Sequence, residues 1–193
     1  MTVEREIKVG LKKEEYETIV KGSDNPEKLT VQTNYYFDTK DLLMNKKGIT
    51  CRTRCKNGIY RSTVKRHTVR EFGYNTETDF CERDTFDPNV FAAFGLYCRG
   101  NLTTERISVY HDKELNVVAD RNTYLGKVDY ELEIEYSESG YLRAKEYLRK
   151  VYELLLKNGL VSGESDWLLR ASTGLSKSER FFLALQNEAQ TRL

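Results

Sequence analysis

The sequence has few of the residues that build transition-metal or zinc sites. It contains only two histidines, His67 and His111, and four cysteines, none of which forms a Cys-x-x-Cys pair. Two histidines are too few for a histidine-rich metal site, and Cys51 and Cys55 lack the second pair that a zinc site requires. We therefore expect reduced thiols with packing or surface roles, which fits a cytoplasmic protein.

Long apolar segments are also missing. No run approaches the roughly 18 apolar residues that a membrane helix needs. The start of the chain is charged between Glu4 and Lys8 and has no apolar stretch typical of a signal peptide. We expect a soluble, cytoplasmic protein with no membrane partner.

A strong charge of one sign is the third absence. The 31 Lys and Arg residues against 30 Asp and Glu residues leave a net charge of +1, so no overall field attracts nucleic acid. An anion site must therefore come from local clustering of cations. With 193 residues, 39% of them hydrophobic, the chain is long and apolar enough for a single folded domain over residues 1–193. The sequence does not indicate an oligomeric state.

What the sequence does contain is a series of short strands and a few helices. Alternation and composition predict strands at 2–9, 30–37, 49–54, 60–67, 102–110, 115–120 and 128–136. A further strand near Thr78 to Arg83 has no assigned role, and Asn57-Gly58 is a strong hairpin turn. Helical periodicity predicts helices at 12–21, 140–158 and 176–190, and Asp87-Pro88 predicts another that ends at Gly95.

Two of these strands carry rows of carboxylates. The period of two places Glu4 and Glu6 with Lys8 on one face of the first strand. In the last strand, acidic side chains occupy one face and apolar side chains the other; the acidic row is Asp129, Glu131, Glu133 and Glu135. Aligned carboxylates repel one another, so this row needs cations nearby.

Cations gather on other strands. Arg52 and Arg54 share one face, Lys65 lies across the Asn-Gly hairpin, and Arg106 belongs to a later strand. In an ordinary sheet with helices on one side, these ionic faces are merely solvated. In a closed barrel with helices outside, they line an interior. An acidic patch beside a basic wall would bind a divalent metal ion together with a polyphosphate, because hard cations prefer carboxylate oxygens and phosphates prefer Arg and Lys.

Several of these segments, in this order, resemble a known family. The segments are Glu4-x-Glu6-x-Lys8, Asn34-Tyr35-Tyr36-Phe37-Asp38-Thr39, Gly48-Ile49-x-Cys51-Arg52-x-Arg54, Thr63-Val64-Lys65, Glu105-Arg106, Asp120-x-Asn122-x-Tyr124-x-Gly126, Asp129-Tyr130-Glu131-Leu132-Glu133 and Lys177-Ser178-Glu179-Arg180-Phe181. The set is similar to the CYTH superfamily, also called triphosphate tunnel metalloenzymes, and its ending is similar to that of the small bacterial branch. Cys51 and Ser62 stand where that pattern has aliphatic residues.

The resemblance implies an α+β fold in which an eight-stranded antiparallel β-barrel forms a tunnel with helices packed outside. It implies Mg²⁺ or Mn²⁺ bound by Glu4, Glu6, Glu131 and Glu133, with Asp120 as a further acidic contact. It implies phosphate binding by Lys8, Arg52, Arg54, Lys65, Arg106 and Lys177. The implied catalytic residues are Glu4, Glu6, Lys8, Glu131 and Glu133. Asp129 and Glu135 rank lower, because we expect them near the tunnel mouths, and we expect Tyr35, Tyr36 and Phe37 in the core.

The function implied is metal-dependent hydrolysis of a small triphosphate-bearing substrate, either inorganic triphosphate or a nucleoside or organic triphosphate. Two alternatives stay open. A class IV-type adenylate cyclase would use the same metal and phosphate contacts but needs an adenosine pocket, for which the sequence has no purine-specific motif. A non-catalytic polyphosphate- or nucleotide-binding module would use the same residues without turnover.

Overall fold

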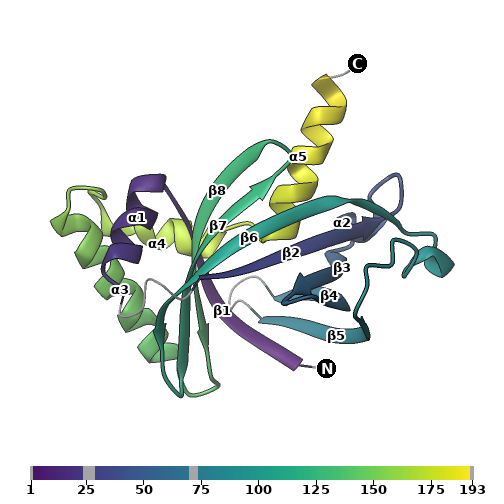
Figure 1. Cartoon of the computed structure of the whole chain (residues 1–193). Coiled ribbons are helices and arrows are strands. Elements are labelled where there is room, and N and C mark those ends of the chain that lie inside the picture. The colour runs from purple at the N-terminus through teal and green to yellow at the C-terminus, as the bar shows by residue number, and fades with distance from the viewer. Residues whose placement is uncertain (1, 24–28, 70–73, 192–193) are drawn as a thin grey trace.

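The protein is an antiparallel β-barrel with helices on its outside (Figure 1). The computed structural model describes residues 2–23, 29–69 and 74–191. Its strands in this part of the chain are β1 (Thr2–Leu11), β2 (Leu29–Asp38), β3 (Ile49–Lys56), β4 (Ile59–Val69), β5 (Tyr74–Arg83), β6 (Tyr97–His111), β7 (Leu115–Tyr124) and β8 (Lys127–Tyr136). The strands hydrogen-bond in the order β1-β5-β4-β3-β2-β6-β7-β8, and β8 pairs again with β1. The alternative of an ordinary sheet with solvated ionic faces is therefore wrong.

The helices differ in how well the sequence predicted them. Within the described ranges they are α1 (Lys13–Lys21), α2 (Leu43–Lys46), α3 (Tyr141–Lys157), α4 (Glu164–Thr173) and α5 (Lys177–Thr191), with a 3₁₀ turn at Ala92–Phe94. Helices α1, α3 and α5 confirm the predictions, whereas α4 was missed. Helix α4 buries Trp167 but leaves Leu168 and Leu169 exposed, so it lacks a regular apolar stripe. None of the described helices is long and apolar enough to cross a membrane.

The predicted helix that ends at Gly95 is wrong, since only the 3₁₀ turn forms there. Asp87 accepts a hydrogen bond from the backbone N–H of Asn89, but this closes a turn rather than starting a helix. Phe91 is buried against Phe37 on the barrel wall, whereas Phe94 is 63% exposed. A helix would place both rings on one face, so packing of Phe91 alone favours the irregular segment.

The apolar strand faces pack against helices, as the barrel interpretation requires. Leu132 and Ile134 of β8 lie in one core cluster with Leu148 and Leu155 of α3 and with Trp167 of α4. Because strand side chains alternate, the acidic residues between these apolar positions point into the barrel. The strand predicted at 115–120 continues to Tyr124, and the chain turns at Leu125 and Gly126, both of which have positive φ.

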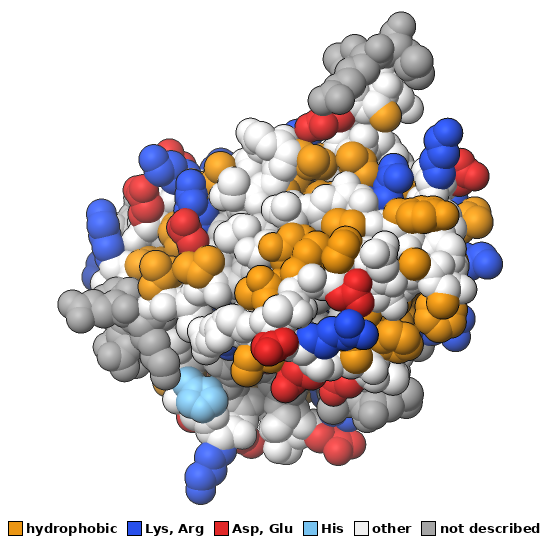
Figure 2. All heavy atoms as spheres, turned by 45° about the vertical axis from the view of Figure 1, so that its right-hand side comes forward, with side chains coloured by type: hydrophobic (Ala, Val, Ile, Leu, Met, Phe, Trp, Pro, Cys, Tyr) orange, Lys and Arg blue, Asp and Glu red, His pale blue; other side chains and the backbone are white. Residues whose placement is uncertain are grey.

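Helix α5 packs on the barrel through aromatic side chains. Phe181 and Phe182 are buried against Tyr36 of β2. Gly100 of β6 permits this close approach, because a Cβ at this position would lie 2.9 Å from the Phe181 ring. The outer surface is mixed: Figure 2 shows apolar side chains gathered on one face with charged side chains around them.

Candidate functional site

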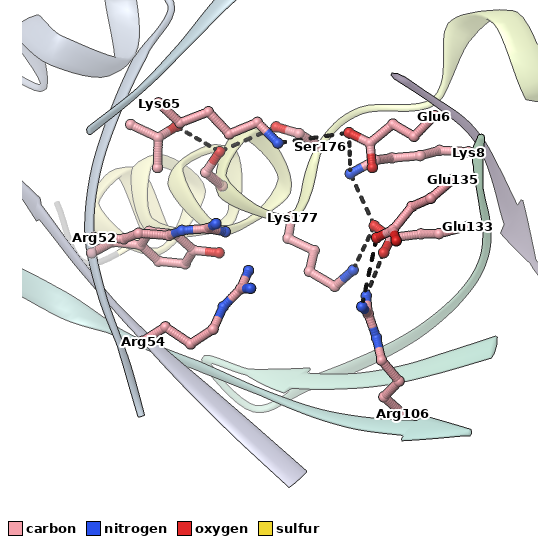
Figure 3. Close-up of a pocket in the computed structure, with 13 residues that line it drawn as sticks. Glu6, Lys8, Arg52, Arg54, Lys65, Arg106, Glu133, Glu135, Ser176 and Lys177 are labelled. Atoms are coloured by element: carbon pink, nitrogen blue, oxygen red, sulfur yellow. Dashed lines mark hydrogen bonds and ion pairs between the residues drawn. The ribbon is translucent and has the colours of Figure 1, made fainter. Parts of the chain in front are cut away.

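The barrel encloses a cavity of about 60 Å³ lined by polar and charged side chains. Figure 3 shows them pointing toward one another: Glu6, Glu133 and Glu135 lie on one side, in contact with Lys8, Arg106 and Lys177, and Arg52 and Arg54 lie on the other side. The lining consists of Glu6, Lys8, Tyr36, Thr50, Arg52, Arg54, Lys65, Arg106, Glu133, Glu135, Ser176, Lys177 and Ser178. All six residues that the sequence predicted for phosphate binding therefore line this one cavity.

The acidic side consists of Glu6, Glu133 and Glu135, which we call the outer trio. One carboxylate oxygen from each lies within 4.8 Å of the others. The antiparallel register of β1 and β8 aligns Glu6 with Glu135 and Lys8 with Glu133. Lys8 Nζ lies 3.2 Å from Glu6 Oε1 and 2.9 Å from Glu133 Oε1. Burial opposes the Lys8 charge, but Glu133 and Glu6 more than compensate and raise its pKa.

Glu135 is the carboxylate of the outer trio with the weakest cation contacts. It accepts a hydrogen bond from Asn116 Nδ2 at 2.7 Å, and Arg106 Nη1 lies 3.9 Å away. Burial, together with the charges of Glu133 and Glu6, raises the pKa of Glu135. The sequence ranked this residue below its neighbours. Its position in the acidic row of β8 was the signal that could have identified it.

A second group, Asp120, Glu131 and Glu133, forms what we call the inner trio. Its three carboxylates are buried and also lie within 4.8 Å of one another. Asp120 and Glu131 do not line the cavity. Burial opposes ionisation of Glu131, but the charges of Lys177 and Arg180 lower its pKa to about 2.

Cations fill the space around the inner trio. Lys177 Nζ lies 2.8 Å from Asp120 Oδ2 and 2.9 Å from Glu133 Oε1, and it also contacts Glu131. Arg106 donates two hydrogen bonds to Asp120, at 2.8 and 2.7 Å, and contacts Glu133. Arg180 Nη1 lies 2.8 Å from Glu131 Oε2. The inner trio is therefore neutralised by the protein itself.

The cations on the opposite side are less uniformly paired. Arg52 Nη2 donates to Glu77 Oε2 at 2.7 Å, and Lys65 Nζ lies 3.6 Å from Glu6 Oε1. Arg54 has no carboxylate within ion-pair distance among the described residues; its Nε donates to Asn34 Oδ1 at 3.0 Å. Burial, with the charges of Arg52 and Arg106, lowers the pKa of Arg54 to about 10. The cavity thus holds a half-buried guanidinium with no carboxylate at ion-pair distance in the described part of the chain.

Two of these contacts were missed by sequence reasoning. Glu77 belongs to β5, the strand whose role was left open, and its register opposite Lys65 places it inside the barrel. Burial opposes ionisation of Glu77, but Arg52 lowers its pKa. Asn34 is fully buried, and its Nδ2 has no hydrogen-bond partner within the described residues. The charge pattern of the strands could not single out Asn34, because an amide carries no charge that alternation can reveal.

The start of α5 is built to hold Lys177 at the cavity. Ser176 N donates to Glu179 Oε2 at 2.8 Å and Glu179 N donates to Ser176 Oγ at 3.3 Å, which is a capping box. Ser178 Oγ lies 2.9 Å from Thr50 Oγ1, so the first turn is also bonded to β3. These contacts position Lys177 as the first residue of the helix.

Other predicted residues lie elsewhere. The side chain of Glu4 lies outside the described residues, although its backbone pairs with Asn75 of β5. Asp129 does not line the cavity; it accepts hydrogen bonds from Arg180 and from Tyr124. Tyr36 is buried as expected, but it also lines the cavity.

Comparisons with known proteins agree with this architecture. The CYTH domain model matches residues 2–166. The chain is 29% identical over 147 residues to the Bacillus subtilis protein YjbK, provisionally named a triphosphatase, covering 69% of this chain and 77% of that one.

Two solved structures have the same fold at low sequence identity. A Bacillus halodurans protein provisionally described as an adenylate cyclase has a TM-score of 0.64 and 21% identity, covering 94% of this chain and all (100%) of the other. The Hippeastrum protein HpAC1, described as having a dominant triphosphatase activity, has a TM-score of 0.66 and 19% identity, covering 93% of this chain and 95% of the other.

Proposed function

The chain belongs to the CYTH family, and from this premise we propose that it hydrolyses a triphosphate-bearing substrate inside the barrel with the help of a divalent metal ion. The triphosphatase names of its relatives agree with hydrolysis. The single observation that carries the proposal is Arg54, which is half-buried, lies opposite the outer trio across one cavity and has no carboxylate at ion-pair distance among the described residues.

Arg54 marks the place of an anion. A buried guanidinium without a carboxylate is costly, and an anionic ligand removes that cost. Its planar group can donate two parallel hydrogen bonds to one phosphate, which a lysine cannot do. Arg52 and Lys65 extend the same wall, so a chain of linked phosphates can be neutralised along it. We assign these three residues to phosphate binding.

The outer trio fits a hard divalent ion. Its donors are carboxylate oxygens within 4.8 Å of one another, which suits Mg²⁺ or Mn²⁺ rather than a metal that prefers sulfur or imidazole. Glu6, Glu133 and Glu135 would hold the ion, with Glu4 of the same β1 face as a further predicted ligand. When bound, the ion supplies a Lewis acid that polarises phosphoryl oxygens.

Side chains of the protein bind the phosphates and neutralise the charge that develops during the reaction. Lys8 lies between Glu6 and Glu133, so its ammonium can exchange a carboxylate for a phosphate oxygen with little movement. Arg52 and Arg54 neutralise charge that develops as water attacks phosphorus and the bond to the leaving phosphate oxygen breaks. The products are inorganic phosphate and the diphosphate-bearing remainder, and the proton of the attacking water is released.

A substrate panel tests this function. We would incubate the chain with inorganic triphosphate or ATP, with Mg²⁺, Mn²⁺ or excess chelator, and measure phosphate, pyrophosphate and cyclic AMP. The proposal predicts phosphate release that requires the metal. Cyclic AMP with pyrophosphate would indicate a cyclase instead. Tight triphosphate binding without any product would indicate a non-catalytic binding module.

A further inference from the structure

The two trios share Glu133 but differ in the cation that each holds. The ammonium of Lys177 contacts all three carboxylates of the inner trio, with Asp120 at 2.8 Å and Glu133 at 2.9 Å. An ammonium has three N–H donors, so one acceptor for each donor satisfies it completely. The outer trio contains no comparable group, because Lys8 contacts Glu6 and Glu133 but has no ion-pair contact with Glu135 among the described residues.

The place of Lys177 in its helix is a second indication that the inner trio holds this cation. A cation in the first turn of a helix is disfavoured by the helix dipole. The capping box of Ser176 and Glu179 nevertheless begins the helix at Lys177. The three carboxylates offset this unfavourable position, and burial removes competing water. The burial and contacts of Lys177 therefore match those of a bound cation.

We propose that the Lys177 ammonium is the resident cation of the inner trio, so the chain binds one divalent ion, at the outer trio, in the absence of substrate. This inference rests on the proposed metal-dependent function. It reassigns Lys177 from phosphate binding to charge compensation, and it reassigns Asp120 and Glu131 from metal ligands to partners of Lys177.

Electrostatics keeps a divalent ion out of the inner trio. An ion there would lie within a few ångströms of the Lys177 ammonium, which already contacts all three carboxylates. Repulsion between charges at such distances is large in a buried site. Displacing Lys177 would leave its ammonium without its three acceptors and would disturb the first turn of α5.

Counting bound Mn²⁺ tests the proposal without any activity measurement. We would titrate the substrate-free chain with Mn²⁺ and follow free Mn²⁺ by electron paramagnetic resonance. The wild type should bind one ion, Lys177→Met should bind two, and Lys177→Arg should bind one because the charge is retained. Lys150→Met, an exposed lysine of α3, is the matched control and should bind one ion.

Two further variants locate the bound ion. In an otherwise unchanged chain, Glu135→Gln should weaken binding of the single ion at least about tenfold, as expected for loss of a ligand charge, whereas Asp120→Asn should leave the stoichiometry at one. Thermal unfolding monitors folding of each variant.

Two ions on the wild type would overturn the role of Lys177 while leaving the proposed function intact, and this result does not depend on whether Lys177→Met folds. No bound ion, together with no phosphate release, would instead overturn the proposed function on which the inference rests.

Discussion

The outer and inner trios use the same carboxylate chemistry in different electrostatic surroundings. In the inner trio, protein cations hold the pKa of Glu131 at about 2. In the outer trio, burial and neighbouring carboxylates raise the pKa of Glu135. A cluster of acidic residues is therefore not in itself a metal site, because neighbouring cations decide whether its charge is already balanced.

The cations of the cavity also differ in how far the protein itself balances their charge. Arg106 and Lys177 form ion pairs with the inner trio, whereas among the described residues Arg54 bonds to the neutral Asn34 oxygen and to no carboxylate. The two most weakly paired groups among the described residues, Glu135 on one side and Arg54 on the other, face the same cavity. A metal ion and a phosphate would satisfy both at once, which explains why the two ligands are expected to bind together.

Loss of the shared carboxylate should have the largest effect. Glu133→Gln removes a charge from both trios, and we expect phosphate release to fall by about 10²–10³-fold, as for other preorganised electrostatic contacts. Glu105→Gln is the matched control, since Glu105 is a partly exposed glutamate paired with Arg121 away from the cavity lining. Unchanged phosphate release in Glu133→Gln would remove the basis of the site assignment.

Substitution of Arg54 should have the second-largest effect. Arg54→Ala should weaken triphosphate binding by about 10–100-fold, in line with roughly 1.5–3 kcal/mol for hydrogen bonds to charged groups. Arg54→Lys should recover only part of this, because a lysine cannot bind one phosphate through two parallel bonds. Calorimetry with inorganic triphosphate measures both variants; equal affinity in wild type and Arg54→Ala would contradict the assignment.

Substitution of Lys8 should affect the affinities for triphosphate and for Mn²⁺ to different extents. Lys8→Ala removes the ammonium between Glu6 and Glu133, so we expect triphosphate binding to weaken by about tenfold and Mn²⁺ binding to weaken less. Titrating each ligand separately measures this difference. Equal losses for both ligands would show that Lys8 does not lie where metal and phosphate meet.

The smallest effect concerns acid stability. The pKa of Glu131 is lowered on folding, so its stabilising contribution is present above its unfolded value near 4.3 and is lost as the pH falls toward 2. In Lys177→Met the pKa of Glu131 should lie closer to its unfolded value, so acidification should cost the variant less stability than it costs the wild type. Urea unfolding between pH 2 and 6 compares the two chains, and parallel curves would count against the ion pair.

Much of the fold could be predicted because strand alternation is strong where one face is buried. The apolar positions of β8 lie under α3, so Leu132 and Ile134 revealed their strand directly. Helix α4 could not be predicted in the same way, since Trp167 is its only fully buried apolar anchor among the described side chains. The turn at Ala92–Phe94 depends on where Phe91 packs, which is a tertiary contact.

Some residues of the candidate site could be predicted from the sequence and others could not. Glu6, Lys8, Arg52 and Glu133 could be found from regular rows of charge, and all of them line one cavity. Glu77 could not be assigned, because pairing with Arg52 depends on the register between β4 and β5. The sequence also could not distinguish the two trios, because the contact of Lys177, at the start of α5, with the inner trio is a tertiary contact.

Phosphate release from inorganic triphosphate during a Mn²⁺ titration tests the central claim most directly. The wild type should release no phosphate without the metal and should reach full activity as Mn²⁺ saturates the outer trio. Glu6→Gln should need more Mn²⁺ and stay slower at saturation. Metal-independent release, or identical titrations for wild type and Glu6→Gln, would contradict the claim that a divalent ion at the outer trio supports hydrolysis.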